Sequence, residues 1–565
     1  MTFGRVTRRT LIKSAGAVGA AGVFPGLGTS PAGRASAQAP GSDHIDVAIV
    51  GGGISGVYCA WRLKQADPSL NIVVFEQGNH IGGRLLSARP PGISNMVAEL
   101  GGMRYLPPIH QRLVRLIDAL DRNLPEDEQI QTYPFPGSQP QNIAYLRGTR
   151  LRMSDFVDAP ESVPYRLAQS ERGIAPFQLA VQAIDRIVPG ITDLSLTGEA
   201  RRAMAREAVF DGVPLRDQGL WNVMLRVMSN EARNLFVDAS GYGTVVRNLN
   251  AVDGINLYLE SHGVTSGHRA FVQGYQHIPE TLADFFLQQG GDIRLATRIT
   301  AMEWDGDAFE LQHSMGTSRA GSIILAMPKR SLELLSPGSA LLREFSNLLA
   351  TVTPVPAMKL FATYQQPWWR SIGGGSADPI QQGVSTTDLP IRQVYYWPRT
   401  DGRPVTDGSA MLMGSYNSGA VRGYWDALRP LPANASASGD ADVQPATMMT
   451  GSCLDLNTDR WCQHRVPERL LDEASRQLSL LHGVSPAPEI VDAAYRDWND
   501  DPFGGGWHFW NVGVNSQDAI PQIVQPSRQH PLYICGEAYS GTHGWVEGAL
   551  QTADMVLERF NLAPL

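Results

Sequence analysis

The sequence predicts an α/β fold, and three observations in its first ordered part lead to this prediction. The β-branched run His44–Val50 is typical of a buried parallel strand. It leads directly into a glycine-rich turn and then into a helical segment, Val57–Gln65. A second apolar strand follows at Asn71–Phe75. Strand, glycine turn, helix and strand in this order are the beginning of a Rossmann-type dinucleotide-binding domain.

Composition and charge set the outer limits. A chain of 565 residues, 43% of them hydrophobic, can bury large cores and predicts two to four domains. The net charge of −8 comes without any Lys/Arg-rich run, so nucleic acid is not expected as a partner. The four cysteines form no CxxC pattern, and we expect no metal site. Cys453 and Cys462 lie in one polar stretch, and the sequence leaves open whether they form a disulfide.

The N-terminus predicts export from the cytoplasm. Paired arginines in Thr7–Lys13 precede a moderately apolar, Ala/Gly-rich run that ends near Leu27. Ala35–Ala37 then supplies the small residues of a cleavage site. This arrangement resembles a twin-arginine signal, and Pro25 and the many glycines disfavour an uncleaved membrane anchor. We therefore assign residues 1–37 to a signal peptide and expect a periplasmic or secreted protein without a membrane anchor.

The glycine turn predicts where a pyrophosphate would bind. In the GxGxxG pattern the first glycine makes the turn, the second lets the backbone approach the phosphates, and the third allows close helix–strand packing. The helix that follows offers free N–H groups to the anion. An acid at the end of the second strand can accept hydrogen bonds from a ribose. The pattern alone is weak, but here the whole context is present. The predicted contacts are Gly51, Gly53, Ile54, Ser55, Gly56 and Glu76.

Three further segments indicate which dinucleotide is bound. His80–Arg84, Leu532–Glu537 and Thr542–Ala549 resemble the second half of the FAD site in the flavin amine oxidase superfamily. The resemblance implies FAD rather than NAD, with Trp545 and the start of the last helix beside the flavin ring. Family members with a covalent flavin carry a cysteine after the Gly-Glu pair, whereas Ala538–Gly541 has none, so we expect non-covalent FAD. The further cofactor contacts that the resemblance implies are Gly83, Arg84, Gly101, Gly102, Met103, Arg104, Ile299, Glu537, Gly544 and Trp545.

One arginine separates the subfamilies. Ala98–Tyr105 contains the Gly-x-Met-Arg pattern of L-amino-acid oxidases, in which the guanidinium grips the substrate α-carboxylate. A planar fork meets a planar carboxylate with two charge-assisted hydrogen bonds, which fixes orientation as well as charge. Taken alone, Arg104 could equally be a structural arginine at a domain interface.

Two other residues support the same subfamily. Ser385–Tyr396 and Tyr424–Leu428 are similar to stretches of the venom L-amino-acid oxidases, and ungapped alignment puts Tyr416 where the second carboxylate contact lies. Lys359 resembles the family's active-site lysine, which holds a water at flavin N5. The alternative is an ordinary lysine on an edge strand, without a catalytic role. We expect Gly544, Trp545 and Trp507 to contact the substrate as well.

The catalytic base of the family has no clear counterpart. Ungapped counting puts Tyr258 at the position of the family's active-site histidine, and His262 lies one helical turn further on. The sequence therefore identifies no general base.

The resemblance also implies a domain organisation. A discontinuous Rossmann-type FAD-binding domain would comprise residues 44–108, 264–335 and 530–565. A helical insertion would span residues 109–263, because Gln111–Leu120 and Phe177–Ile187 have helical apolar spacing. A mixed α+β substrate-binding domain would span residues 336–529, with a surface loop at 432–450.

The function implied is oxidative deamination of L-amino acids to 2-oxo acids, ammonia and hydrogen peroxide, with O2 as the electron acceptor. Lys359, Arg104 and Tyr416 are the expected catalytic residues. A polyamine or monoamine oxidase on the same fold and a catalytically silent flavin-binding module are the alternatives. The sequence gives neither the preferred side chain nor the physiological role, and it does not fix the oligomeric state, for which a homodimer is one option.

Overall fold

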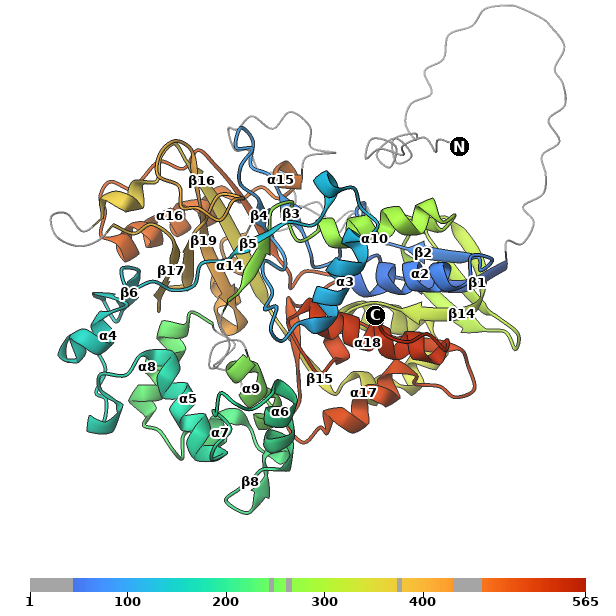
Figure 1. The fold of residues 1–565 in the computed structure, drawn as a ribbon, viewed down its shortest axis with the longest axis horizontal. Helices are drawn as coiled ribbons and strands as arrows, with labels where there is room; N and C mark the ends of the chain where they lie inside the picture. The colour runs from blue at the N-terminus through green and yellow to red at the C-terminus, as the bar shows by residue number, and fades with distance from the viewer. Residues whose placement is uncertain (1–43, 243–247, 261–266, 373–378, 430–459) are drawn as a thin grey trace, which may run out of the picture.

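The computed structural model describes residues 44–242, 248–260, 267–372, 379–429 and 460–565. It confirms the predicted fold class: two seven-stranded sheets lie side by side, one with the α/β topology of a dinucleotide-binding domain, and a group of helices adjoins them (Figure 1). The predicted signal peptide, the 432–450 loop, Cys453 and His262 lie outside the described residues.

The first sheet brings the two ends of the described chain together. Its order is β11 (Asp292–Arg294), β2 (Ile72–Phe75), β1 (His44–Val50), β14 (Gly316–Leu325), β13 (Phe309–His313) and β12 (Ile299–Trp304), and β22 (Leu532–Ile534) also pairs with β14. β1 is parallel to both β2 and β14. Ala48 and Ile49 are fully buried because helices cover this sheet. Helix α2 (Ile54–Ala66) packs against both α10 (His277–Gln288) and α18 (Val546–Arg559).

The second sheet is mainly antiparallel. Its order is β20 (Asp492–Asp497), β16 (Ala357–Tyr364), β19 (Ala410–Ser418), β18 (Gln393–Tyr396), β17 (Gly383–Thr387), β6 (Ile143–Leu146) and β7 (Thr149–Arg152). Every residue of β16 is buried, and the strand pairs on both sides. β6 and β7 belong to the 109–263 stretch, so that stretch contributes strands to this sheet as well as helices.

The helical group forms its own core, at the lower left of Figure 1. It contains α5 (Pro176–Ile187), α6 (Gly198–Glu207), α7 (Leu220–Met224), α8 (Asn230–Ser240) and α9 (Ala251–Tyr258). Ser229 caps α8 by accepting a hydrogen bond from the N–H of Ala232. The helix ends at Gly241, whose φ of +71° is the left-handed conformation that glycine adopts easily.

Smaller elements connect these units. The remaining strands are β3 (Ser87–Ala88), β4 (Ala98–Glu99), β5 (Thr132–Pro134), β8 (Val209–Phe210), β9 (Val213–Pro214), β10 (Arg269–Phe271), β15 (Val352–Val355) and β21 (Trp507–Trp510). The remaining α-helices are α3 (Gln111–Asp121), α4 (Asp155–Asp158), α11 (Lys329–Leu335), α12 (Ala340–Glu344), α13 (Ser346–Leu349), α14 (Arg422–Asp426), α15 (Arg460–Gln463), α16 (Glu468–His482) and α17 (Ser516–Val524). The helices predicted near Gln111–Leu120 and Phe177–Ile187 are α3 and α5.

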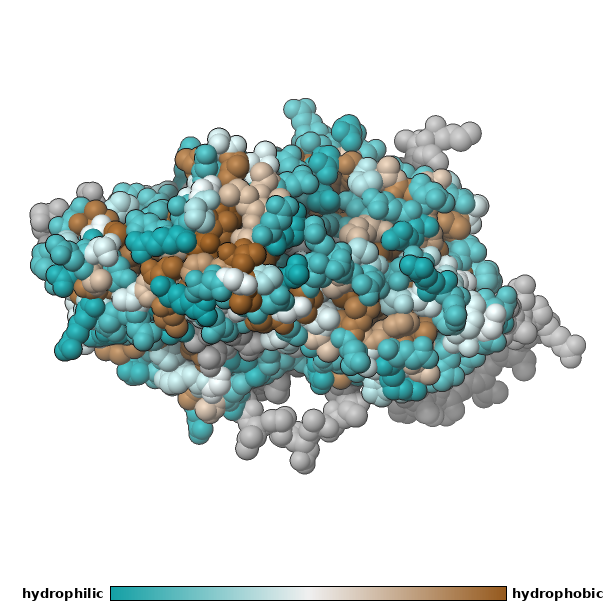
Figure 2. All heavy atoms as spheres, turned by 90° about the horizontal axis from the view of Figure 1, so that it is seen from below, coloured by the Kyte–Doolittle hydropathy of each residue, from teal (hydrophilic) through white to brown (hydrophobic). Residues whose placement is uncertain are grey.

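The surface and the cysteines are unremarkable for a folded protein. Figure 2 shows apolar patches interspersed with polar residues on the face seen from below, as is normal for protein surfaces. No helix in the described part of the chain is long and apolar enough to cross a membrane. Cys59 and Cys535 are free and buried, and Cys462 is disulfide-bonded.

Candidate active site

The glycine turn after β1 forms one end of a cavity. Gly51 has a φ of +113°, and a Cβ there would lie 2.5 Å from the carbonyl oxygen of Ala326. A Cβ on Gly56 would lie 2.0 Å from the carbonyl oxygen of Gly51, so this position requires glycine for packing. Gly53 precedes α2 and provides no side-chain cap, so the first N–H groups of the helix stay open to an anion. The turn therefore fits a dinucleotide pyrophosphate.

Glu76 is held in place at the end of β2. Its carboxylate accepts hydrogen bonds from the N–H groups of Gly52 and Gly78, each at 2.6 Å. The side chain lines the same cavity as the glycine turn. A carboxylate oriented by backbone donors beside the pyrophosphate position suits ribose hydroxyls.

Arg84 and Glu537 join the two distant halves of this cradle. Arg84 Nη1 lies 2.7 Å from Glu537 Oε2. The Glu537 carboxylate also accepts hydrogen bonds from the N–H groups of Gly544 and His508, at 2.8 and 3.0 Å. Burial alone would raise the pKa of Glu537, but Arg84 and His508 outweigh it and hold that pKa well below its ordinary value. The ion pair thus fixes the loop that opens α18 beside the cavity.

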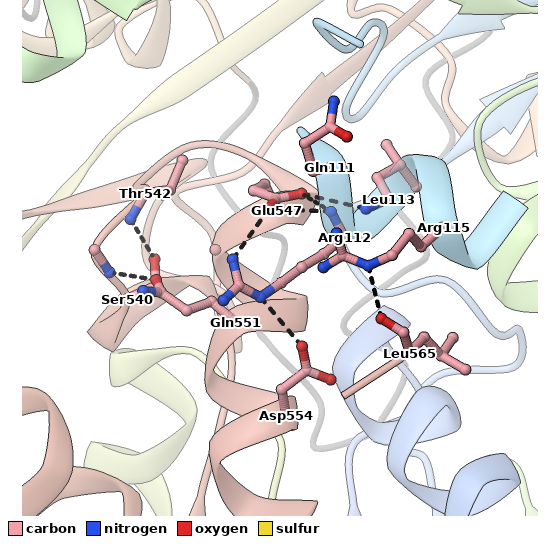
Figure 3. Close-up of polar contacts among 12 residues, drawn as sticks. Gln111, Arg112, Leu113, Arg115, Ser540, Thr542, Glu547, Gln551, Asp554 and Leu565 are labelled. Carbon is pink, nitrogen blue, oxygen red and sulfur yellow. Dashed lines mark hydrogen bonds and ion pairs between the residues drawn. The ribbon is translucent and has the colours of Figure 1, made fainter. Parts of the chain in front are cut away.

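Figure 3 shows how the start of α18 is anchored on its other side. The Glu547 carboxylate accepts hydrogen bonds from the N–H groups of Arg112 and Leu113 and so caps the N-terminus of α3. The Arg112 guanidinium donates to Glu547 in the first turn of α18 and to Asp554, two turns further along the same helix. Trp545, immediately before α18, packs on the ring of His110 with 4.6 Å between centroids. These contacts hold the tryptophan at the cavity wall.

Arg104 carries a positive charge in the wall of the cavity, where its side chain is partly buried. It follows β4, and its Nη2 donates to the hydroxyl of Tyr242 at 3.3 Å. Burial would lower the pKa of Arg104, but the phenols of Tyr395, Tyr242 and Tyr416 favour the cation, and the pKa is raised. Within the residues that the structure describes, no carboxylate lies within ion-pair distance of Arg104. The site therefore presents a guanidinium that lacks an anionic partner.

Lys359 lies on β16, an interior strand of the second sheet that pairs with β19 and β20, and not on an edge strand. Its Nζ donates hydrogen bonds to the main-chain oxygens of Glu99, at 3.1 Å, and Gly101. It also lies 5.0 Å from the ring centroid of Tyr416, the residue opposite it on β19. Burial lowers the pKa of Lys359; the Glu99 carboxylate opposes this shift and Arg104 adds to it.

The structure brings the predicted site residues into one continuous cavity. All of them line this cavity except Gly56, which packs against the backbone of Gly51 in the glycine turn. Sequence reasoning missed several lining residues, for which no local motif gave a signal. They are Tyr242, Leu257 and Trp498. In the described residues no group of His, Cys, Asp or Glu side chains could hold a metal ion.

The glycine turn, Lys359 and Arg104 line the same cavity, which is the arrangement of a dinucleotide-binding enzyme site. The chain belongs to the flavin-containing amine oxidoreductase family, whose sequence model matches residues 54–431 and 450–556. This membership confirms the family inferred from the motifs.

Individual relatives are distant but similar over their length. The chain is 26% identical to Aplysianin-A of Aplysia kurodai over 548 residues, covering 92% of this chain and 90% of that protein. It is 23% identical to the L-amino-acid oxidase of Mus musculus over 524 residues, covering 91% of this chain and 70% of that protein. Among solved structures, a double mutant of putrescine oxidase shares the fold with a TM-score of 0.61 at 17% identity, covering 92% and 99% of the two chains.

Proposed function

We propose that the protein oxidises L-amino acids to 2-oxo acids, ammonia and hydrogen peroxide, using FAD and O2. The observation that carries this proposal is the partly buried Arg104, which contacts phenols and the ring of Phe135 but, in the described structure, no carboxylate. A cation withdrawn from water without an anion is costly, and a substrate carboxylate would supply the missing charge. Two charge-assisted hydrogen bonds to a planar fork would also orient the substrate.

The residues present fit FAD. The open N-terminus of α2 and Gly83 suit the pyrophosphate, and Glu76 suits a ribose. The start of α18, with Gly544 and Trp545, would lie beside the flavin ring, where N–H groups and the helix dipole favour negative charge. We infer non-covalent binding, because Ala538–Gly541 contains no cysteine.

The chain contributes binding and orientation to the reaction. Flavin, when bound, would supply the hydride acceptor and the route by which electrons reach O2. Arg104 and Tyr416 would hold the α-carboxylate so that the α-C–H points toward the cofactor, and such positioning contributes several kcal/mol. Lys359 would hold a water between its ammonium and the cofactor. The tryptophans Trp507 and Trp545 would exclude bulk water.

The same reading extends to the organisation of the chain. The FAD-binding domain would comprise residues 44–108, 264–335 and 530–565, with the helical part at 109–263 and the substrate-binding part at 336–529. The protein would act outside the cytoplasm after removal of residues 1–37.

The test is an oxygen-coupled peroxide assay of the purified yellow protein with the twenty L-amino acids, several D-amino acids, putrescine and spermidine. We expect peroxide with one or more L-amino acids and none with the polyamines. The Arg104→Ala variant should lose this activity. Peroxide only with amines that lack a carboxylate would identify an amine oxidase and make Arg104 structural. A flavin that no substrate bleaches under nitrogen would indicate a silent module.

A further inference from the structure

Tyr242 reaches the site from a part of the chain that the motifs do not include. It follows α8 in the helical group and lines the cavity. Its hydroxyl oxygen accepts the hydrogen bond from Arg104 Nη2. Its ring stands at right angles to that of Tyr416, with 5.6 Å between centroids and 84° between planes. Two phenols from different parts of the fold therefore meet at one guanidinium.

The position of Tyr242 is set by the way α8 docks on the second sheet. Arg392 Nη2 donates to the carbonyl oxygen of Val237 at 2.6 Å and so satisfies the last turn of α8. A Cβ on Gly241 would lie 2.2 Å from Cγ of Gln393, so the chain can pass this close to β18 only as glycine. The residue after this glycine is Tyr242. Its placement over Arg104 follows from the packing of helix and sheet and not from a loop alone.

The chemistry of the phenol suits a carboxylate. A hydroxyl oxygen that accepts from a guanidinium directs its own proton away from that cation, toward an acceptor. Tyr395 is a neighbouring neutral phenol, and its own proton goes to Oε1 of Gln393 at 3.1 Å. An ionised carboxylate is a stronger acceptor than a phenol and would take the proton of the Tyr242 hydroxyl. A carboxylate has about four lone-pair positions, so it can accept from Arg104, Tyr416 and a third donor together.

We propose that Tyr242 is a substrate-binding and specificity-determining residue whose hydroxyl donates a hydrogen bond to the α-carboxylate. The inference rests on the proposed function. It adds the helical part of the chain to the carboxylate site, which is then assembled from three segments: the loop after β4 with Arg104, strand β19 with Tyr416, and the end of α8 with Tyr242. Selection for a carboxylate thereby depends on the docking of α8.

The experiment uses Tyr242→Phe in the holoenzyme, with benzoate as a carboxylate that lacks an amine. Benzoate affinity is measured from the perturbation of the flavin absorbance, without turnover. We expect the dissociation constant to rise about tenfold, the value of one net hydrogen bond. KM for L-amino acids should rise by a similar factor with little change in kcat. Flavin content and Tm confirm that the variant is folded.

Tyr165→Phe is the matched control. The Tyr165 hydroxyl donates to Asp238 of the same helix α8 at 2.7 Å, outside the cavity. Its loss tests whether loosening α8 is enough to weaken benzoate binding. An unchanged benzoate affinity in Tyr242→Phe, or an equal loss in Tyr165→Phe, would overturn the proposal. Arg104→Lys separates this failure from that of the proposed function: if it too binds benzoate normally, the carboxylate site itself is wrong.

Discussion

Lys359 donates a hydrogen bond to the main-chain oxygen of Glu99, although the side chains of both residues are buried and ionisable. The Glu99 carboxylate is itself held by the Ser87 hydroxyl at 2.7 Å and the Tyr275 N–H at 2.8 Å. Burial raises the pKa of Glu99, and Lys359 lowers it. The charge state of the lysine is thus coupled to a glutamate that lies beside it.

The first prediction is that Glu99→Gln lowers the pH at which Lys359 loses its proton. Burial already lowers the pKa of Lys359 to about 7, and removal of Glu99 takes away the influence that raises it. A nearby opposite charge shifts a pKa by one unit or more. Flavin reoxidation by O2, followed by stopped-flow, should therefore lose rate about one pH unit earlier on the alkaline side. Glu99→Asp should restore the wild-type profile, and Lys359→Met should show no such pH limb. A Glu99→Gln profile identical to that of the wild type would show that Glu99 does not influence the pKa of Lys359.

Glu537→Gln should release flavin and destabilise the protein. The substitution leaves Arg84 and the His508 ring facing a neutral amide in a buried site. Breaking a buried ion pair costs about 3–5 kcal/mol. The flavin-to-protein ratio after gel filtration and the Tm of the apoprotein measure the two effects. An unchanged Tm would show that the carboxylate adds nothing to the fold.

Gly56→Ala should prevent the close approach of α2 to the glycine turn. The new Cβ would lie 2.0 Å from a backbone oxygen, which cannot move as a flexible side chain could. We expect a loss of about 1–3 kcal/mol in unfolding free energy and weaker flavin retention. Gly423→Ala is the control, because a Cβ there would contact no atom within 4 Å. Equal behaviour of both variants in thermal unfolding would contradict the packing role.

The protein should lose stability as the pH falls below about 6.5. Burial lowers the pKa of His482 to about 4. In the neutral form its ring accepts from the Tyr396 hydroxyl and donates to the Leu478 carbonyl oxygen. The unfolded chain binds a proton near pH 6.5 and the folded chain does not, so the unfolding free energy falls with pH by about 1.4 kcal/mol per unit for this histidine.

His482→Gln tests that linkage. The variant should be less stable at pH 7.5, but its further loss between pH 7.5 and pH 5 should be about 2 kcal/mol smaller than in the wild type. Denaturant unfolding at the two pH values provides the comparison. Parallel losses in the two proteins would show that other groups dominate the acid response.

Local patterns predicted the part of the site that is continuous in the sequence. The order of strand, turn, helix and strand predicted β1, α2 and β2, and the flanking motifs predicted Arg104, Lys359 and Tyr416 as residues of one cavity. The predictions of β1, α2 and β2 succeeded because each rests on a period or a turn within a few residues. The three site residues were predicted from the resemblance to L-amino-acid oxidases and not from a local pattern.

The rest depends on contacts that have no local signature. Tyr242 follows a recognisable helix-ending glycine, but nothing nearby shows that the helix docks on β18. The pairing of β6 with β17 joins residues about 240 positions apart. The strand-forming residues of β6 lie inside a mainly helical stretch, and nothing near them in the sequence predicts the strand with which they pair. The Glu99–Lys359 contact likewise joins β4, which forms a two-stranded sheet with β3, to β16 of the second sheet, about 260 positions further along the chain.

The ion pair between Arg84 and Glu537 has a consequence for biosynthesis. The two residues are 453 positions apart, yet their contact closes the cradle in which the cofactor would bind. All strands of the second sheet lie between these two residues in the sequence. During synthesis, Arg84 can therefore pair with Glu537 only after that whole sheet has been made. Contacts of such long range form slowly and late. Cofactor binding is therefore one of the last steps of folding. Folding intermediates without the Arg84–Glu537 pair expose an incomplete parallel sheet, which can aggregate.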